Sequence, residues 1–203
     1  MAPQARPEIL DMQLADSLLR DRHWMPPEEF DARIILDIGC SIGVTTLEFA
    51  RRWPDAVVIG IDADRRNVSQ ARIRTDAFNE RVGIYRAILG RDGERACLTG
   101  HKPNRRSLQG DGHMPEHVTT MLLDTLLEIL LLDWCTFDFV KMDIEGAETI
   151  VLEGEWLDRT DRIIVDYHDN LDLVREILFS RGLPHITEFP ASEGSWGSVY
   201  AKR

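Results

Sequence analysis

The sequence predicts an α/β fold, in which helices cover both faces of a doubly wound, mostly parallel sheet. The first observation is an apolar run over residues 34–38 that ends beside an acid and is followed by Gly39 and Gly43. The second is another apolar run over 57–62, which ends in Asp62 after an intervening helical pattern. Strand, glycine loop, helix and strand in this order are typical of a nucleotide-binding unit. Ligands of such sheets bind outside the carboxyl ends of the strands.

The other elements follow from local periodicity and from turn residues. An amphipathic pattern over 7–20 predicts a helix within an N-terminal extension, residues 1–30. The helices expected after it cover 45–52, 67–79, 122–132, 147–152 and 171–180. The expected strands cover 34–38, 57–62, 82–89, 138–142, 162–167 and 198–201. Strands and helices therefore alternate along the chain, which favours parallel strands.

Residues 90–117 have a different character, because polar, glycine and proline residues replace the apolar periods. A long stretch of this kind inside a domain is usually either functional or disordered. We expect a partly ordered loop or hairpin beside the active site, with a solvated insertion as an equal alternative. The candidate substrate contacts in this stretch are His101, Asn104, Arg105, Arg106 and His113.

Length and composition indicate one domain over residues 1–203. The chain is 43% hydrophobic and 29% charged, as in ordinary soluble globular proteins. Its formal net charge of -11 disfavours a nucleic-acid partner, because binding to phosphates requires a basic surface. We therefore expect a small-molecule partner, neutral or cationic.

The cysteines are few and scattered: Cys40, Cys97 and Cys135. They match neither a disulfide framework nor a zinc site, so a reducing cytoplasm is the simplest compartment. Cys40 lies in the glycine loop, where a small residue that fits is favoured over a reactive thiol. The longest apolar run, 126–134, is far shorter than the ~20 residues that span a bilayer, and the N-terminus lacks a signal-peptide pattern. We expect no membrane segment.

Asp37 indicates which kind of nucleotide binds. A dinucleotide puts its pyrophosphate against the glycine loop, where a carboxylate would repel it. S-adenosylmethionine has no phosphate, and its sulfonium and ammonium groups would be attracted by a carboxylate. The spacing of Gly39 and Gly43 also differs from the G-x-G-x-x-G dinucleotide fingerprint. Asp37 therefore favours a ligand that carries a positive charge.

A second dense motif covers residues 137–148 and contains Lys141, Asp143, Glu145 and Glu148. If residues 139–142 form a central strand, Asp143 and Glu145 lie at its carboxyl end, on the same rim as the glycine loop. Acids beside a buried strand are costly unless they are paired or functional. An ion pair between Lys141 and Asp143 that only fixes the loop is the structural alternative.

Together, the glycine unit, the segment 120–127 and the motif 140–148 resemble the FkbM-type family of S-adenosylmethionine-dependent methyltransferases. The family has a Leu-Asp-x-Leu segment, then a strand that ends in Lys-x-Asp-x-Glu-Gly-x-Glu, and then a strand that ends in an acid near a polar residue. The last of these is here the segment 163–168. The resemblance covers residues 34–170 and implies a seven-stranded, Rossmann-like methyltransferase sheet.

The resemblance also implies roles for single residues. Asp37, Gly39 and Gly43 would line the methionine end of the cofactor, and Asp62 would accept hydrogen bonds from the ribose hydroxyls, as one carboxylate can from a diol. The adenine side would be formed by Ala87 and Ile88. Asp64, close to Asp62, is a less certain contact and can equally be solvated. Many family members have an aromatic residue, Glu and Pro where this chain has Ile61, Asp62 and Ala63.

Methyl transfer to a hydroxyl requires a base or a metal that lowers the pKa of the hydroxyl. The candidate catalytic residues are Asp143, Glu145 and His168, whose imidazole has an ordinary pKa near ~6.5. A rim histidine held by hydrogen bonds is the alternative for His168. A magnesium ion, which is not favoured, would be held by oxygens of Asp143, Asp166, Asp169 and Asn170.

These observations predict a methyltransferase that uses S-adenosylmethionine and acts on a hydroxyl of a small molecule, such as a sugar or a secondary metabolite. The acceptor class follows from the resemblance. A nucleotide-dependent oxidoreductase and a non-catalytic module that retains the cofactor pocket are the two alternatives.

Overall fold

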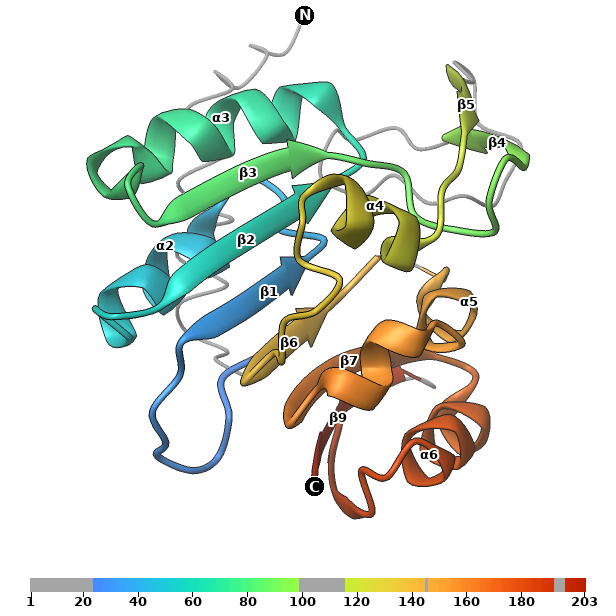
Figure 1. Ribbon diagram of the computed structural model, residues 1–203. Helices are drawn as coiled ribbons and strands as arrows, with labels where there is room; N and C mark the ends of the chain where they lie inside the picture. The colour runs from blue at the N-terminus through green and yellow to red at the C-terminus, as the bar shows by residue number, and fades with distance from the viewer. Residues whose placement is uncertain (1–23, 99–115, 145, 192–195) are drawn as a thin grey trace, which may run out of the picture.

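The computed structural model describes residues 24–98, 116–144, 146–191 and 196–203 (Figure 1). Within them, one mixed sheet has the strand order β3-β2-β1-β6-β7-β9-β8. Its strands are β1 (Ile34–Ile38), β2 (Val57–Asp62), β3 (Val82–Arg86), β6 (Phe139–Met142), β7 (Arg162–His168), β8 (His185–Pro190) and β9 (Trp196–Lys202). A separate antiparallel pair consists of β4 (Arg95–Leu98) and β5 (Glu116–Thr119).

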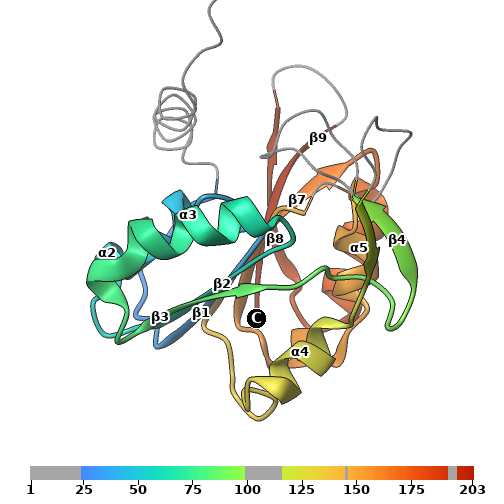
Figure 2. The ribbon, with the colours of Figure 1, turned by 90° about the horizontal axis from the view of Figure 1, so that it is seen from above.

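Helices connect the strands and cover both faces of the sheet. They are α2 (Val44–Arg52), α3 (Arg65–Thr75), α4 (Leu123–Ile129), α5 (Glu148–Leu152) and α6 (Leu171–Ser180), with 3-10 turns η1 (Asp76–Phe78) and η2 (Glu155–Arg159). Figures 1 and 2 show α2 and α3 on one face, opposite α4 and α5. In the described ranges, every helix is too short or too polar to cross a membrane.

The centre of the sheet is parallel. β1 pairs in parallel with β2 and β6, which pair in parallel with β3 and β7. These strands are largely apolar on both faces, which is typical of a sheet covered by helices on both sides. Phe139 packs with Phe49 on the α2 side, whereas Val140 packs with the core of α4 and α5. The carboxyl ends of the parallel strands therefore meet at one rim.

The last strand, β9, runs antiparallel between β7 and β8. Its side chains also anchor the segment that precedes β1. The carboxylate of Glu28 accepts hydrogen bonds from the Tyr200 hydroxyl at 2.8 Å, from the ammonium of Lys202 and from Nε of Arg162 at 3.2 Å. Residues near the two ends of the described chain are thus joined at one carboxylate.

The predicted α/β fold is confirmed, with shifted bounds. The third strand ends at Arg86 rather than at residue 89, because the chain leaves the sheet and Leu89 makes only a single bridge to Met121. The following stretch, predicted as a loop or hairpin, contains β4 and β5. The edge strand β8 was not predicted, and the N-terminal helix predicted over 7–20 lies outside the described residues.

Candidate active site

The glycine loop is held against its neighbours by the backbone. The N–H groups of Gly39 and Cys40 both donate to the carbonyl oxygen of Ile61, at 2.8 and 3.0 Å. Gly39 has a φ of 78°, and a Cβ there would lie 1.8 Å from the carbonyl oxygen of Asp143. Only glycine fits this approach, because the ends of β1 and β6 nearly touch.

Asp62, at the end of β2, organises the neighbouring backbone. Its Oδ2 accepts the N–H of Ser41 at 2.9 Å, and its Oδ1 accepts the N–H of Asp64 at 2.8 Å and Nδ2 of Asn67 at 3.1 Å. Burial raises the pKa of the Asp62 carboxyl, while these hydrogen bonds oppose the rise. Asp64 is not solvated, because it caps α3 by accepting the N–H groups of Arg66 and Asn67. This cap explains why α3 begins at residue 65 instead of 67.

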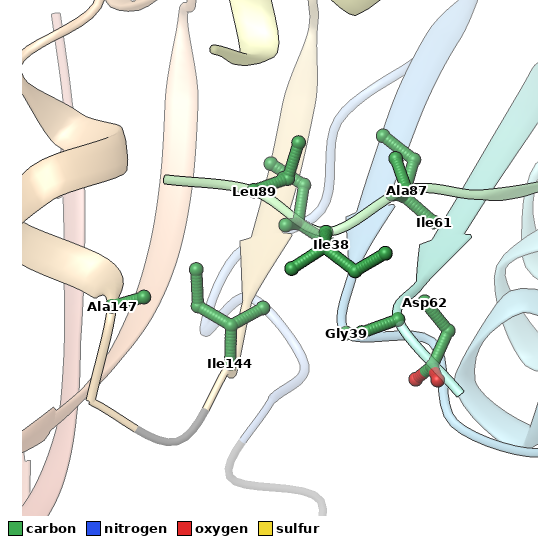
Figure 3. A pocket seen from close by; sticks show the side chains of 10 residues that line it. Ile38, Gly39, Ile61, Asp62, Ala87, Leu89, Ile144 and Ala147 are labelled. Atoms are coloured by element: carbon green, nitrogen blue, oxygen red, sulfur yellow. The ribbon is translucent and has the colours of Figure 1, made fainter. Parts of the chain in front are cut away.

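A small, partly open cavity lies at the carboxyl ends of the parallel strands. Its apolar lining is formed by Ile38, Ile61, Ala87, Ile88, Leu89, Ile144 and Ala147, and its other lining residues are Gly39, Asp62 and Ala63. Figure 3 shows Asp62 beside Gly39 at one end of the cavity, with Ile144 and Ala147 toward the other. Four residues predicted to bind the cofactor, Gly39, Asp62, Ala87 and Ile88, thus line one space.

Asp37 is placed differently from the prediction, which put it against the cationic end of the cofactor. Its side chain is fully buried and does not line the cavity. Oδ2 accepts hydrogen bonds from the hydroxyls of Thr45 and Thr46, both at 2.6 Å, and Oδ1 lies 3.5 Å from Nζ of Lys141. The negative charge of Asp37 is therefore matched inside the protein, beneath the glycine loop.

Gly43 and Cys40 serve the packing of the protein and do not line the cavity. Gly43 has a φ of 81°, and a Cβ there would meet Cβ of Ala71 on α3 at 2.8 Å. Gly43 therefore lets α2 and α3 approach each other, and it does not line the cavity. The thiol of Cys40 is buried. Burial is the main cause that raises its pKa, and the negative charge of Asp37 raises it further. A raised pKa opposes formation of the reactive thiolate.

Lys141 links the two motifs found in the sequence. Its Nζ donates to the carbonyl oxygen of Gly39 at 2.8 Å and lies 3.9 Å from Oδ2 of Asp143. Burial alone would lower the pKa of Lys141, but the charges of Asp37 and Asp143 raise it above its usual value. The ammonium therefore stays charged, and the ion pair with Asp143 that the sequence suggested is present. Asp143 is still about one-third exposed at the rim.

Glu148 connects the loop after β6 to the end of β7. Its buried carboxylate accepts the N–H groups of Ile144 at 3.2 Å and of Gly146 at 2.9 Å. Oε1 also lies 3.7 Å from Nδ1 of His168, whose side chain is partly exposed. The structure thus brings Asp143 and His168 to the ends of adjacent strands, with Glu148 behind the histidine. Glu145 lies outside the described residues.

Two of the residues considered for magnesium use a side-chain oxygen in hydrogen bonds within the protein. Oδ1 of Asp166 accepts a hydrogen bond from the hydroxyl of Ser198 at 2.7 Å, and Oδ1 of Asn170 accepts the N–H of His168 at 3.1 Å. In the part of the chain that the structure describes, no group of three or more His, Cys, Asp or Glu side chains is arranged to hold a metal ion. The residues predicted as substrate contacts between positions 101 and 113 lie outside that part.

Sequence reasoning missed Asn67, Ile144 and Ala147. Asn67 carried a usable signal, because Asp64 is a typical N-cap residue and a helix that begins after it puts Asn67 in the first turn, close to Asp62. Ile144 and Ala147 are single apolar residues between the acids of the second motif, so no apolar period marks them.

Comparison with known proteins agrees with this geometry. Residues 35–89 match the family model of a methyltransferase domain. An O-methyltransferase from Bacillus cereus, solved in complex with SAH, superposes with a TM-score of 0.52 at 16% identity over 100% of this chain and 84% of that chain. The fold is the Rossmann-like methyltransferase fold. The family match and the fold together support an S-adenosylmethionine-dependent methyltransferase.

Two curated relatives match parts of the chain. The 2-O-methyltransferase NoeI of Sinorhizobium fredii is 26% identical over 67% of this chain and 63% of its own length. The 7SK snRNA methylphosphate capping enzyme of Mus musculus is 42% identical over 38% of this chain and 12% of its own length. The chain therefore spans less than two-thirds of the length of either relative.

The Leu-Asp segment of the predicted family motif has a structural contact in this methyltransferase fold. The carboxylate of Asp124, on α4, accepts the N–H groups of Glu155 at 3.1 Å and of Trp156 at 2.7 Å. These groups lie at the start of η2, which precedes β7. Asp124 therefore joins α4 to the connection between α5 and β7, away from the cavity.

Proposed function

We propose that the protein is an S-adenosylmethionine-dependent O-methyltransferase of the FkbM type, with a small molecule as acceptor. The observation that carries this proposal is the cavity itself, which combines an apolar lining with the Asp62 carboxylate at one end. Apolar walls suit an adenine ring, and a carboxylate suits the ribose hydroxyls. The spacing of Gly39 and Gly43 departs from the dinucleotide fingerprint, which disfavours a pyrophosphate at the loop.

We assign cofactor binding to the residues that line the cavity. Ala87 and Ile88 would contact the adenine, and Asp62 would accept a ribose hydroxyl. The Asp62 carboxylate already accepts three hydrogen bonds within the protein. Those from the N–H of Ser41 and the side chain of Asn67 would hold it in place before the cofactor binds. Asp37 would not contact the cofactor. It would hold the ammonium of Lys141, which in turn positions the carbonyl of Gly39.

When bound, S-adenosylmethionine supplies a methyl group on a sulfonium, so that transfer to a hydroxyl forms a C–O bond and breaks a C–S bond. In this proposal His168 takes the hydroxyl proton, because an imidazole accepts protons readily near neutral pH. The carboxylate of Glu148, 3.7 Å from Nδ1, would orient the ring and stabilise the imidazolium. Asp143 would accept a hydrogen bond from the acceptor and align it, while Glu145 stays a further candidate.

The acceptor and the compartment belong to the same proposal. A net charge of -11 favours a small neutral molecule over RNA, although the murine relative is named as an RNA-capping enzyme. Cys40 and Cys135 are buried free thiols, which supports a reducing compartment such as the cytoplasm.

The test is calorimetric titration with S-adenosylmethionine, S-adenosylhomocysteine and NAD, followed by a methyl-transfer assay over a panel of hydroxyl compounds and RNA. We expect both adenosyl ligands to bind, NAD not to bind, and a hydroxyl compound to be methylated. Asp143→Asn should lower turnover more than cofactor affinity. Tight NAD binding without S-adenosylmethionine binding would indicate an oxidoreductase. Cofactor binding with no product from any compound would indicate a non-catalytic module.

A further inference from the structure

Beyond the cavity, an indole and several polar side chains share the carboxyl rim of β6 and β7. Asp143 follows β6, and β9 begins at Trp196. Asp166 and His168 are among the last three residues of β7. Because β9 runs antiparallel to β7, its first residues lie beside the last residues of β7. In the strand order β1-β6-β7-β9, only β6 separates the end of β7 from the glycine loop that follows β1.

The strand register gives these side chains a common side. His168 pairs with Trp196, and Asp166 pairs with Ser198, across the antiparallel ladder of β7 and β9. Residues directly opposite each other in such a ladder project from the same face of the sheet. The indole therefore has an imidazole and a carboxylate as neighbours on one face.

The backbone at Trp196 has partners on both sides, since Trp196 pairs with His168 of β7. The carbonyl oxygen of Trp196 accepts the N–H of Ala191 at 3.2 Å. At the next residue, Gly197, a Cβ would lie 2.7 Å from both the hydroxyl of Tyr167 and the carbonyl oxygen of Phe189. The indole is nevertheless 50% exposed. A large aromatic surface held open on a backbone with partners on both sides can bind a ligand with little loss of conformational entropy.

We propose that Trp196 is the platform on which the ring of a neutral carbohydrate acceptor stacks, with Asp166 and His168 receiving its hydroxyl groups. The negative face of an indole attracts the slightly positive C–H groups of a pyranose ring. Carboxylate and imidazole acceptors match the hydroxyls at the edge of that ring. Asp143 and Asp166 would repel a phosphorylated or carboxylated acceptor. This inference rests on the proposed function and names the acceptor class of the same site.

The experiment measures acceptor binding and methyl transfer separately, with the protein saturated with S-adenosylhomocysteine for binding. The probes are neutral methyl glycosides and, in parallel, flat phenols, detected by saturation-transfer NMR. The variants are Trp196→Ala, Trp196→Phe and Trp134→Ala. Trp134 is the matched control, because it is 77% exposed but precedes β6, at the opposite end of the strands.

We expect Trp196→Ala to weaken glycoside binding by about tenfold, Trp196→Phe to retain most of it, and Trp134→Ala to bind like the parent. Affinity for S-adenosylhomocysteine should be equal in all four proteins, which shows that each is folded. Equal glycoside binding by Trp196→Ala and the parent would overturn the inference, as would preferential binding of phenols. Glycoside binding without methyl transfer would refute the proposed function and leave this inference standing. Methyl transfer to other acceptors without glycoside binding would overturn this inference and leave the proposed function standing.

Discussion

Nζ of Lys141 lies 3.5 Å from Oδ1 of Asp37, and this ion pair is buried beneath the glycine loop. The same nitrogen donates to the carbonyl oxygen of Gly39 at 2.8 Å. In a dry interior each charge depends on the other, because removing one leaves the second without compensation. The pair therefore couples the stability of the fold to the shape of the loop.

Replacing Lys141 with Met should leave Asp37 charged and unmatched. We expect the free energy of unfolding to fall by about 3–5 kcal/mol, measured by urea denaturation at pH 7. Arg66→Met, at an exposed cation, is the control and should change it by no more than ~0.5 kcal/mol. A loss below 1 kcal/mol for Lys141→Met would be too small for a broken buried ion pair. It would mean that Asp37 is not charged in the folded protein.

Gly39→Ala and Gly93→Ala form a matched pair, since both glycines have a positive φ, 78° and 69°. At Gly93 a Cβ would meet nothing within 4 Å, whereas at Gly39 it would lie 1.8 Å from the carbonyl oxygen of Asp143. The first substitution should therefore abolish binding of S-adenosylhomocysteine in calorimetry. The second should cost only about 1–2 kcal/mol of stability, from backbone strain. Normal ligand affinity in Gly39→Ala would show that β1 and β6 can separate without loss of the site.

Asp62→Ala should weaken binding of S-adenosylhomocysteine by about 1.5–3 kcal/mol, the range for a hydrogen bond to a charged group. The variant also frees the N–H of Ser41, so the glycine loop should become more accessible to hydrogen exchange. Asp55→Ala, at an exposed acid before β2, serves as the control. An unchanged affinity would mean that another residue recognises the ribose.

The contribution of Glu28 to stability should depend on pH. Hydrogen bonds from Lys202 and then Tyr200 lower the pKa of its carboxyl from 4.5 to about 2 in the folded protein. Because the folded pKa lies below the unfolded one, the stabilisation is complete above pH 4.5 and is lost as the pH falls toward 2. The stability difference between the parent and Glu28→Gln should shrink over that window in chemical denaturation.

Glu29→Gln is the control for this prediction, since the side chain of Glu29 is 89% exposed. Its stability difference from the parent should stay flat over the same pH range. A constant difference for Glu28→Gln down to pH 2 would exclude the lowered pKa.

The central sheet could be predicted because its strands are continuous apolar runs whose ends are marked by glycine or acidic residues. β8 could not, because it is an edge strand whose residues, such as Glu188, are mostly exposed and show no apolar run. The stretch that contains β4 and β5 could be predicted only as a loop or hairpin without strand bounds, since two short strands with a long connection leave little periodicity.

The site was partly predictable for a related reason. Gly39 and Asp62 are identified by local spacing, and both line the cavity. The burial of Asp37 depends on Lys141, which is 104 positions later in the sequence, and on the hydroxyls of Thr45 and Thr46. A charge-matching partner so distant in sequence becomes visible only when β1 and β6 pair.

The position of β9 between β7 and β8 has a consequence for the order of folding. Both neighbours precede β9 in the sequence, yet each pairs with β9 and not with the other. During synthesis, β7 must therefore wait with an open edge until residues 196–202 have left the ribosome. This half of the sheet should close only after translation of β9, and until then the unpaired edge of β7 is open to pairing with other chains.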